Sequence, residues 1–202
     1  MGSFPTDFMR HGVCSVDVGA LDIGDAEWKR LTEAVSATTC PYEEITHEKR
    51  GAHQWIRIAR FITDEPLPSE TKHPVTSLAV DVIAREVVTR RVCELTGFEH
   101  LRLRRVQAHV LEPGNFLDPH IDNGANPLWD ISVICGFESA SQGGTLVVEA
   151  EGGSKFSYDG RPGTVVLFHA NLRHEITRVV SGQRRTLACW YSRSDSPNPA
   201  RA

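Results

Sequence analysis

The feature that most constrains the fold is a change in hydrophobic period after Gly97. From there to residue 192, short runs of alternating or continuous apolar residues recur between turns such as "SQGG" and "YDGRPG". Many short strands at this spacing are typical of an antiparallel sandwich or barrel. The expected strands are 101–111, 129–137, 144–149, 154–158, 163–169, 174–180 and 184–192.

The first hundred residues carry the helical patterns. In "DAEWKRLTEAVSA" (25–37), Trp28, Leu31 and Val35 recur at helical spacing. Apolar residues three and four apart lie on one face of a helix, which can then pack on a sheet. The segment predicts an amphipathic helix with Asp25 as its N-cap.

A second and longer helical pattern covers residues 74–97. Pro74 suits the first helical position and Gly97 suits the position just after a helix end. Between the two helical patterns, "WIRIARFI" (55–62) alternates and predicts a strand. One buried stripe on the long helix would contain Leu78, Val82, Val88, Val92 and Leu95.

The chain of 202 residues, 40% hydrophobic and 24% charged, is long enough to bury a substantial core. We find no internal repeat and no clear linker. We therefore expect one domain overall: a helical and strand region (1–100) packed on a β-core (101–193), followed by a disordered tail (194–202).

The net charge of −4 and the pI near 6.1 offer no general attraction to nucleic acid or to an anionic membrane. No apolar run reaches transmembrane length, and the start of the chain lacks the apolar segment of a secretory signal. The five cysteines are odd in number and have no metal-binding spacing. These features predict a cytoplasmic protein that has neither nucleic acid nor membrane as a partner.

A His-x-Asp triplet lies in "DPHIDNGANP" (118–127). With nine His and eleven Asp in the chain, chance alone gives roughly half a match, so the triplet is weak by itself. Residues two apart on a strand share a face, so His120 and Asp122 can point to the same side. His174 is the best third ligand, because two His and one carboxylate can hold Fe(II) with positions left open.

Arg184 follows His174 by ten residues, on the next expected strand. The intervening "VSGQ" (180–183) fits a hairpin that would bring the two strands side by side. A guanidinium inside a barrel needs an anionic partner, since an unpaired buried charge is costly. A dicarboxylate co-substrate would supply that anion, and arginine would bind it through two parallel hydrogen bonds.

Taken together, four segments resemble the 2-oxoglutarate/Fe(II)-dependent oxygenases, in particular their prolyl-hydroxylase-like branch. The resemblance covers roughly residues 102–192 and lies in the order and spacing of the set. It implies a mainly β fold with flanking helices, built on a double-stranded β-helix of the jelly-roll or cupin type. The segments are "PGNFLDPHIDN" (113–123), "GGTLVV" (143–148), "RPGTVVLFHANLRHEI" (161–176) and "SGQRRTLACW" (181–190).

The resemblance also assigns roles to residues. It implies that His120, Asp122 and His174 hold the iron and that Arg184 binds the C5 carboxylate of 2-oxoglutarate. Thr186, two residues beyond Arg184, should share its face and can add a hydrogen bond.

The substrate pocket is less constrained. The resemblance places Trp190 near the pocket. Related enzymes often carry a Tyr that touches the co-substrate, but "VQAHVLEPG" (106–114) has none. Either Gln107 or His109 takes that role, or the contact is absent. Trp129 can wall the pocket beyond the iron ligands. Counter-charges for an amino-acid-like substrate could come from Arg105, Glu112 or Arg161.

The implied cofactors are Fe(II), 2-oxoglutarate as co-substrate, and O₂. We expect oxidation of an unactivated C–H bond of a small molecule, such as a free amino acid or a natural-product precursor. The outcome is hydroxylation, or desaturation or ring closure. The alternative is a hydroxylase of protein or peptide side chains of the prolyl type. The intact triad disfavours a non-catalytic barrel, and the acidic pI disfavours a nucleic-acid demethylase acting through the basic run "RLRR" (102–105).

Overall fold

The structure, a computed structural model, describes residues 4–49 and 52–199. The helices are α1 (Phe4–His11), α2 (Asp25–Ser36), α3 (Pro74–Ile83) and α4 (Glu86–Thr96), with two short 3₁₀ helices, η1 (Val18–Leu21) and η2 (Asp122–Gly124). The strands are β1 (Val13–Asp17), β2 (Glu43–Lys49), β3 (Ala52–Asp64), β4 (Pro68–Glu70), β5 (Arg102–Leu111), β6 (Phe116–His120), β7 (Ile131–Glu138), β8 (Leu146–Glu149), β9 (Lys155–Tyr158), β10 (Thr164–His169), β11 (His174–Ile176) and β12 (Arg184–Ser192).

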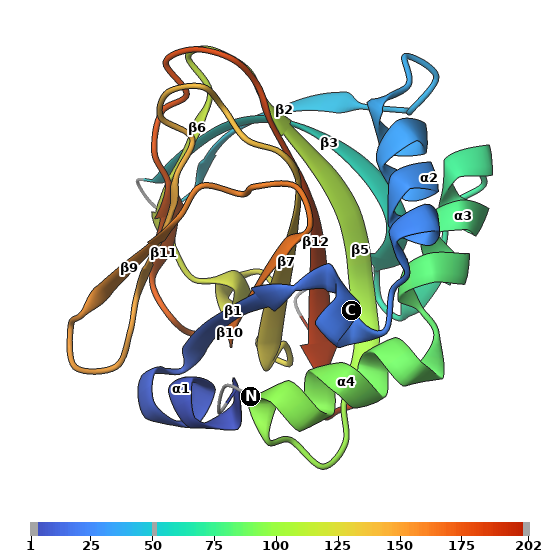
Figure 1. Ribbon diagram of the computed structural model, residues 1–202, viewed down its shortest axis with the longest axis vertical. Coiled ribbons are helices and arrows are strands. Elements are labelled where there is room, and N and C mark those ends of the chain that lie inside the picture. The colour runs from blue at the N-terminus through green and yellow to red at the C-terminus, as the bar shows by residue number, and fades with distance from the viewer. Residues whose placement is uncertain (1–3, 50–51, 200–202) are drawn as a thin grey trace.

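The strands form one antiparallel sheet in the order β1-β10-β7-β12-β5-β3-β6-β11-β8-β9, with β2 and β4 paired to β3. The sheet curls on itself, and α2, α3 and α4 lie outside β3 and β5 (Figure 1). This is the expected jelly-roll core of the double-stranded β-helix type, so the predicted fold class is confirmed. No helix in the described part of the chain is long and apolar enough to cross a membrane.

Strand β10 shows why its sequence is apolar without alternation. Val165 and Leu167 pack in the core between the sheet and the helices, whereas Val166 and Phe168 pack in the core enclosed by the curled sheet. Successive side chains of a strand point to opposite faces, so a strand buried on both faces reads as a continuous apolar run. The sheet therefore has a helix-covered face and a face lining the barrel interior, here called the lumen face.

The first hundred residues contribute strands to this sheet as well as helices. Strand β1 pairs with β10, and β3 lies between β5 and β6. The α2 helix packs on the outer face through Trp28, which stacks on Phe137 with ring centroids 4.5 Å apart. These pairings support our proposal that the chain forms one domain, with residues 1–3 and 50–51 outside the described part.

The prediction of a single helix over 74–97 is wrong, because the chain breaks into α3 and α4 at Arg85. This residue has extended backbone (φ −63°, ψ 141°) and precedes α4 as its N-cap. Its guanidinium donates to Glu27 Oε1 (3.1 Å) and to the carbonyl oxygen of Asp22 (2.9 Å). These tertiary contacts accompany the break, so the five apolar residues of the expected stripe lie on two helices. Gly97 ends α4 in the left-handed region (φ 76°), as predicted.

Two smaller expectations also fail. The N-cap of α2 is Gly24, whose N–H donates to the Glu27 side chain (3.0 Å), and Asp25 is the first helical residue. The hairpin expected through 180–183 does not form, since β11 ends at Ile176 and pairs with β6 and β8, whereas β12 pairs with β5 and β7.

The segment after β12 packs on the body, contrary to the expectation of disorder from residue 194. Arg104 donates to the carbonyl oxygens of Ser194 (3.1 Å) and Ser196 (2.9 Å). Asn198 is buried and donates to the carbonyl oxygen of Asp64 (3.1 Å). Residues 200–202 of the expected tail lie outside the described residues.

Asp64, at the end of β3, is the acceptor at the centre of a buried polar network. Its carboxylate accepts hydrogen bonds from Arg104 Nη2 (2.7 Å), Asn126 Nδ2 (2.7 Å) and Trp129 Nε1 (3.0 Å). Asp64 and Arg104 are each only 1% exposed. The network ties β3 and β5 to the segment that follows Asp122.

We expect Asp64→Asn to lower the free energy of unfolding by about 3–5 kcal/mol, because it removes the charge that neutralises buried Arg104 and turns one acceptor into a donor. The measurement is chemical denaturation followed by circular dichroism. Asp159→Asn is the control, since its pair with Arg161 is exposed and should contribute about 0–1 kcal/mol. Equal losses in the two variants would contradict a structural role for the network.

Candidate active site

Three residues that could bind a metal ion meet at one end of the barrel. His120 ends β6 and His174 begins β11, and the two residues are directly paired across these strands with ring centroids 4.3 Å apart. Asp122 Oδ1 lies 3.6 Å from Nε2 of each histidine. One ligand atom from each residue lies within 4.8 Å of the others, so the cluster could hold one metal ion.

Hydrogen bonds select the nitrogen that each histidine offers. Nδ1 of His120 lies 2.8 Å from the carbonyl oxygen of Asp118, and Nδ1 of His174 lies 3.0 Å from that of Leu172. A carbonyl oxygen can only accept, so each Nδ1 carries a proton, and when the imidazole is neutral its Nε2 presents a lone pair to the centre of the cluster. Metal-binding histidines are usually oriented in this way.

Asp122 lies in η2 and not on a strand, so alternation along a strand is not what turns it toward the histidines. Its N–H donates to the carbonyl oxygen of Ala170 (2.9 Å), and its Oδ2 accepts from the Ser132 hydroxyl (2.6 Å). Burial by itself would raise the pKa of this carboxyl, but His174 and His120 outweigh it and hold the pKa well below its usual range. The carboxylate is therefore ionised, as a metal ligand must be.

Arg184 lies on the lumen face of β12 and is 1% exposed. Its Nη1 donates to Thr186 Oγ1 (3.1 Å), whereas Nε and Nη2 have no hydrogen-bond partner among the described residues. Gly160 (φ +72°) leaves room for the guanidinium, because a Cβ there would lie 3.3 Å from Nε. Burial lowers the pKa of Arg184 to about 10, so the group is still a cation at neutral pH. This buried cation with unused donors fits a carboxylate ligand.

Gln107 and His109 lie on the lumen face of β5, where His109 is directly opposite Thr186. Nε2 of Gln107 and Nε2 of His109 are 2.5 Å apart. Burial, followed by the charge of Arg184, lowers the pKa of His109 to about 3, so the ring is uncharged. Gln107 and His109 therefore line the lumen beside the position where an anionic ligand would bind Arg184.

The two expected pocket tryptophans lie against each other. The rings of Trp129 and Trp190 stack with centroids 4.9 Å apart and an interplanar angle of 23°. Trp190 lies directly opposite Ser132 of β7, the residue that hydrogen-bonds Asp122. Ser132 thus connects the two features: it is paired with Trp190 of the indole pair and donates to Asp122 of the metal cluster.

The three candidate counter-charges separate in the structure. The Arg105 guanidinium lies 5.8 Å from the ring centroids of both Trp129 and Trp190. Glu112 is half-exposed and pairs with Arg57 at 3.1 Å, and Arg161 is exposed in a surface pair. Arg105 is therefore the one of the three that lies with the indole pair.

Three residues of the site were not predicted from the sequence: Asp64, Asn126 and Ser132. Asp64 and Asn126 fix Trp129 and its loop, and Ser132 fixes the Asp122 carboxylate. Ser132 had one available signal, because it interrupts the apolar run of its strand at a lumen-facing position. Asp64 and Asn126 are 62 residues apart, and no local period relates them.

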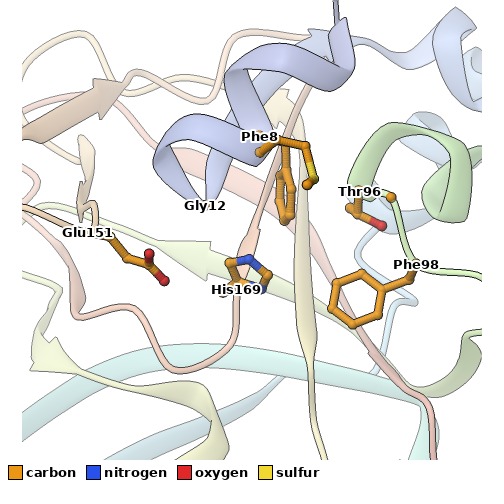
Figure 2. Close-up of a pocket in the computed structure, with 8 residues that line it drawn as sticks. Phe8, Gly12, Thr96, Phe98, Glu151 and His169 are labelled. Carbon is orange, nitrogen blue, oxygen red and sulfur yellow. The ribbon is translucent and has the colours of Figure 1, made fainter.

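A separate cavity of about 280 Å³ lies between α1 and the end of α4. Figure 2 shows His169 at its floor, with Phe8 and Phe98 beside the imidazole and Glu151 across from it. His169 is the last residue of β10 and does not belong to the cluster of His120, Asp122 and His174.

The β-core of the chain matches a known sequence family. Residues 106–192 match the sequence family described as the 2OG-Fe(II) oxygenase superfamily. No curated protein is a significant match to the sequence.

Solved structures share the fold at low sequence identity. A Burkholderia pseudomallei oxidoreductase of the 2OG-Fe(II) oxygenase family is 23% identical with a TM-score of 0.86, over 96% of this chain and 92% of that one. A Pseudomonas putida prolyl-4-hydroxylase is 14% identical with a TM-score of 0.63, over 95% and 98%. The α-ketoglutarate-dependent epimerase SnoN of nogalamycin biosynthesis is 13% identical with a TM-score of 0.63, over 93% and 80%.

Proposed function

We propose that this chain, whose residues 106–192 match the 2OG-Fe(II) oxygenase superfamily, oxidises an unactivated C–H bond of a small molecule. The observation that carries the proposal is the metal-ligand cluster of His120, Asp122 and His174 in the same lumen as the buried cation of Arg184. When bound, Fe(II) with 2-oxoglutarate and O₂ supplies the oxidising power, and 2-oxoglutarate leaves as succinate and CO₂.

Each residue of the site has a proposed task. His120, Asp122 and His174 would hold the iron through one atom each, and two histidines with one carboxylate are a ligand set typical of Fe(II) oxygenases. Arg184 binds the far carboxylate of 2-oxoglutarate, and Thr186 holds the guanidinium in place through its hydroxyl. Arg184 and Thr186 are buried, and charge interactions between buried groups are stronger than in water.

A small-molecule substrate is favoured by the segment that follows Asp122. Asn126 and Trp129 fold inward onto Asp64 and are 0% and 4% exposed. Because the segment after Asp122 packs against the body of the protein, we expect it to leave a small substrate pocket. An extended peptide would instead need an open groove or a free strand edge. Peptides and small molecules are both found bound to proteins of this fold: a Trichoplax adhaerens prolyl hydroxylase is in complex with a hypoxia inducible factor peptide fragment, and the epimerase SnoN is in complex with nogalamycin RO.

The basic run at 102–105 does not favour a nucleic-acid substrate. Arg102 is exposed near Asp195, Arg104 is buried against Asp64, and Arg105 lies over the indole pair. The three guanidinium groups therefore form no continuous basic track of the kind that follows a phosphate backbone. The five free cysteines support our further proposal of a cytoplasmic location.

We expect succinate release to be stimulated more by a free amino acid or small derivative than by any prolyl or aspartyl peptide. The measurement is 2-oxoglutarate turnover over a panel of each class, with mass spectrometry of the products. A gain of one oxygen indicates hydroxylation, and a loss of two hydrogens indicates desaturation or ring closure. The Asp122→Ala variant is the control for succinate formed without the site. Stimulation by peptides and by no small molecule would move the assignment to the protein-hydroxylase alternative.

A further inference from the structure

Two polar atoms of uncharged side chains on the lumen face are buried without a hydrogen-bond partner among the described residues. They are the indole N–H of Trp190, a donor, and Oε1 of Gln107, an acceptor. The two residues are 5% and 8% exposed. A buried polar group that lacks a partner destabilises the fold, so in a binding site we expect it to meet a bound ligand or an ordered water.

The register of the sheet places both residues beside the metal cluster. On the face shared by β5 and β12, Gln107 is opposite Ala188, and Trp190 lies two residues further along β12. On its other side β12 pairs with β7, and there Trp190 is opposite Ser132, which donates to Asp122. The unmatched donor and acceptor are thus neighbours on one wall, next to the iron ligands.

The contact with His109 fixes which end of the Gln107 amide is available. The uncharged His109 ring can accept at one nitrogen, and Gln107 Nε2 lies 2.5 Å from its Nε2. The amide N–H₂ therefore donates to the imidazole. Its oxygen is the end left to accept a hydrogen bond from a ligand.

The stacked partner of Trp190 provides an internal comparison. Trp129 has the same ring and similar burial, but its indole N–H donates to Asp64 at 3.0 Å. The indole N–H of Trp129 is thus hydrogen-bonded within the protein, whereas that of Trp190 has no acceptor among the described residues. The contrast assigns a structural hydrogen bond to Trp129 and a ligand-directed donor to Trp190.

The co-substrate cannot satisfy both atoms. At neutral pH, 2-oxoglutarate carries two carboxylates and a ketone, all of which only accept hydrogen bonds. It has no hydrogen to donate to Gln107 Oε1. A group that accepts from an indole and also donates to an amide oxygen must belong to another molecule in the lumen.

We infer that Trp190 and Gln107 form a recognition subsite for a substrate group that both accepts and donates a hydrogen bond, namely a hydroxyl or a carboxamide. This inference rests on the proposed function and names the substrate chemistry of that site. An analogue in which the donor is replaced by a methyl group leaves Gln107 Oε1 unmatched, so the subsite should reject it.

The test uses ¹⁵N-labelled protein loaded with Zn(II) and 2-oxoglutarate, so that binding occurs without turnover. The chain has four Trp, and the indole signal missing in Trp190→Phe identifies Trp190. The probes are butanamide, 1-butanol, and 2-pentanone, which is the amide with its nitrogen replaced by a methyl carbon. We expect butanamide and 1-butanol to shift the Trp190 signal with dissociation constants about tenfold lower than that of 2-pentanone. Gln107→Leu should abolish the difference between butanamide and 2-pentanone.

The outcomes separate the inference from the proposed function. Equal binding of butanamide and 2-pentanone, or no shift of the Trp190 signal by any probe up to its solubility limit, overturns the subsite while 2-oxoglutarate binding still supports the oxygenase. Failure of the protein to bind 2-oxoglutarate overturns both.

Thermal unfolding gives a second readout that needs no ligand. Trp129→Phe and Trp190→Phe remove the same atoms, but only the first breaks a hydrogen bond to a buried carboxylate. We expect the Tm of Trp129→Phe to lie about 2–6 °C below that of Trp190→Phe. The same Tm in both variants, or the reverse order, would mean that Trp190 N–H has a structural partner and would overturn the assignment.

Discussion

Replacing Asp122 by alanine should weaken Fe(II) binding more than about a hundredfold and abolish 2-oxoglutarate-dependent succinate release. Loss of an outer hydrogen-bond partner of a metal ligand already costs about 10–100-fold in affinity, and Asp122 supplies both a ligand atom and the one negative charge of the cluster. His174→Ala should have a similar effect, because it also leaves two protein ligands. Anaerobic calorimetric titration with Fe(II) measures both.

Two further variants make this prediction specific. Ser132→Ala should weaken Fe(II) binding less than either ligand variant, since it removes only the hydroxyl that donates to Asp122 Oδ2. His169→Gln should bind Fe(II) like the wild type, because His169 faces the separate cavity of Figure 2. Normal affinity in both Asp122→Ala and His174→Ala would remove these residues from the proposed metal site.

The residues of the proposed site come together in the structure, but not for the reasons that the sequence suggested. His120, Asp122, His174 and Arg184 do converge on one lumen, yet the two local arguments for that convergence fail. Asp122 lies in a 3₁₀ turn held by Ala170, and β11 and β12 are not neighbours. Strand β11 pairs with β6 and β8, and β12 pairs with β5 and β7, so the short spacing between His174 and Arg184 did not produce a shared hairpin.

The helical region shows the same limit. Nothing in "VIAREVV" (82–88) ends a helix, because Ala, Arg and Glu all favour helical backbone. The break at Arg85 accompanies its contacts with Glu27 and Asp22, residues about sixty positions away. Period and end signals therefore predicted where the helical pattern starts and stops, whereas its interruption depends on tertiary contacts.

Arg184→Met should raise the concentration of 2-oxoglutarate required for turnover by about a hundredfold, which corresponds to about 3 kcal/mol for a lost charge-assisted pair, with Fe(II) affinity unchanged. Arg184→Lys should recover only part of this loss, since an ammonium cannot present two parallel N–H groups to a carboxylate. Arg185→Met is the matched control: Arg185 is the next residue on β12, but it pairs with Glu138 and Ser36 away from the lumen. If Arg184→Met and Arg185→Met respond alike to 2-oxoglutarate, the carboxylate binds elsewhere.

Arg184→Met should weaken 2-oxoglutarate binding without lowering the stability of the protein. This contrast separates a binding role of Arg184 from a structural one. Without co-substrate, Arg184 is a buried cation whose only hydrogen bond among the described residues is to Thr186. Replacing such a charge by an apolar side chain of similar length is often neutral or stabilising. We therefore expect the Tm of Arg184→Met to equal or exceed that of the wild type when 2-oxoglutarate is absent, while the rise in Tm that 2-oxoglutarate gives the wild type is lost. A variant that is unstable without 2-oxoglutarate would instead mean that a structural anion within the protein neutralises Arg184.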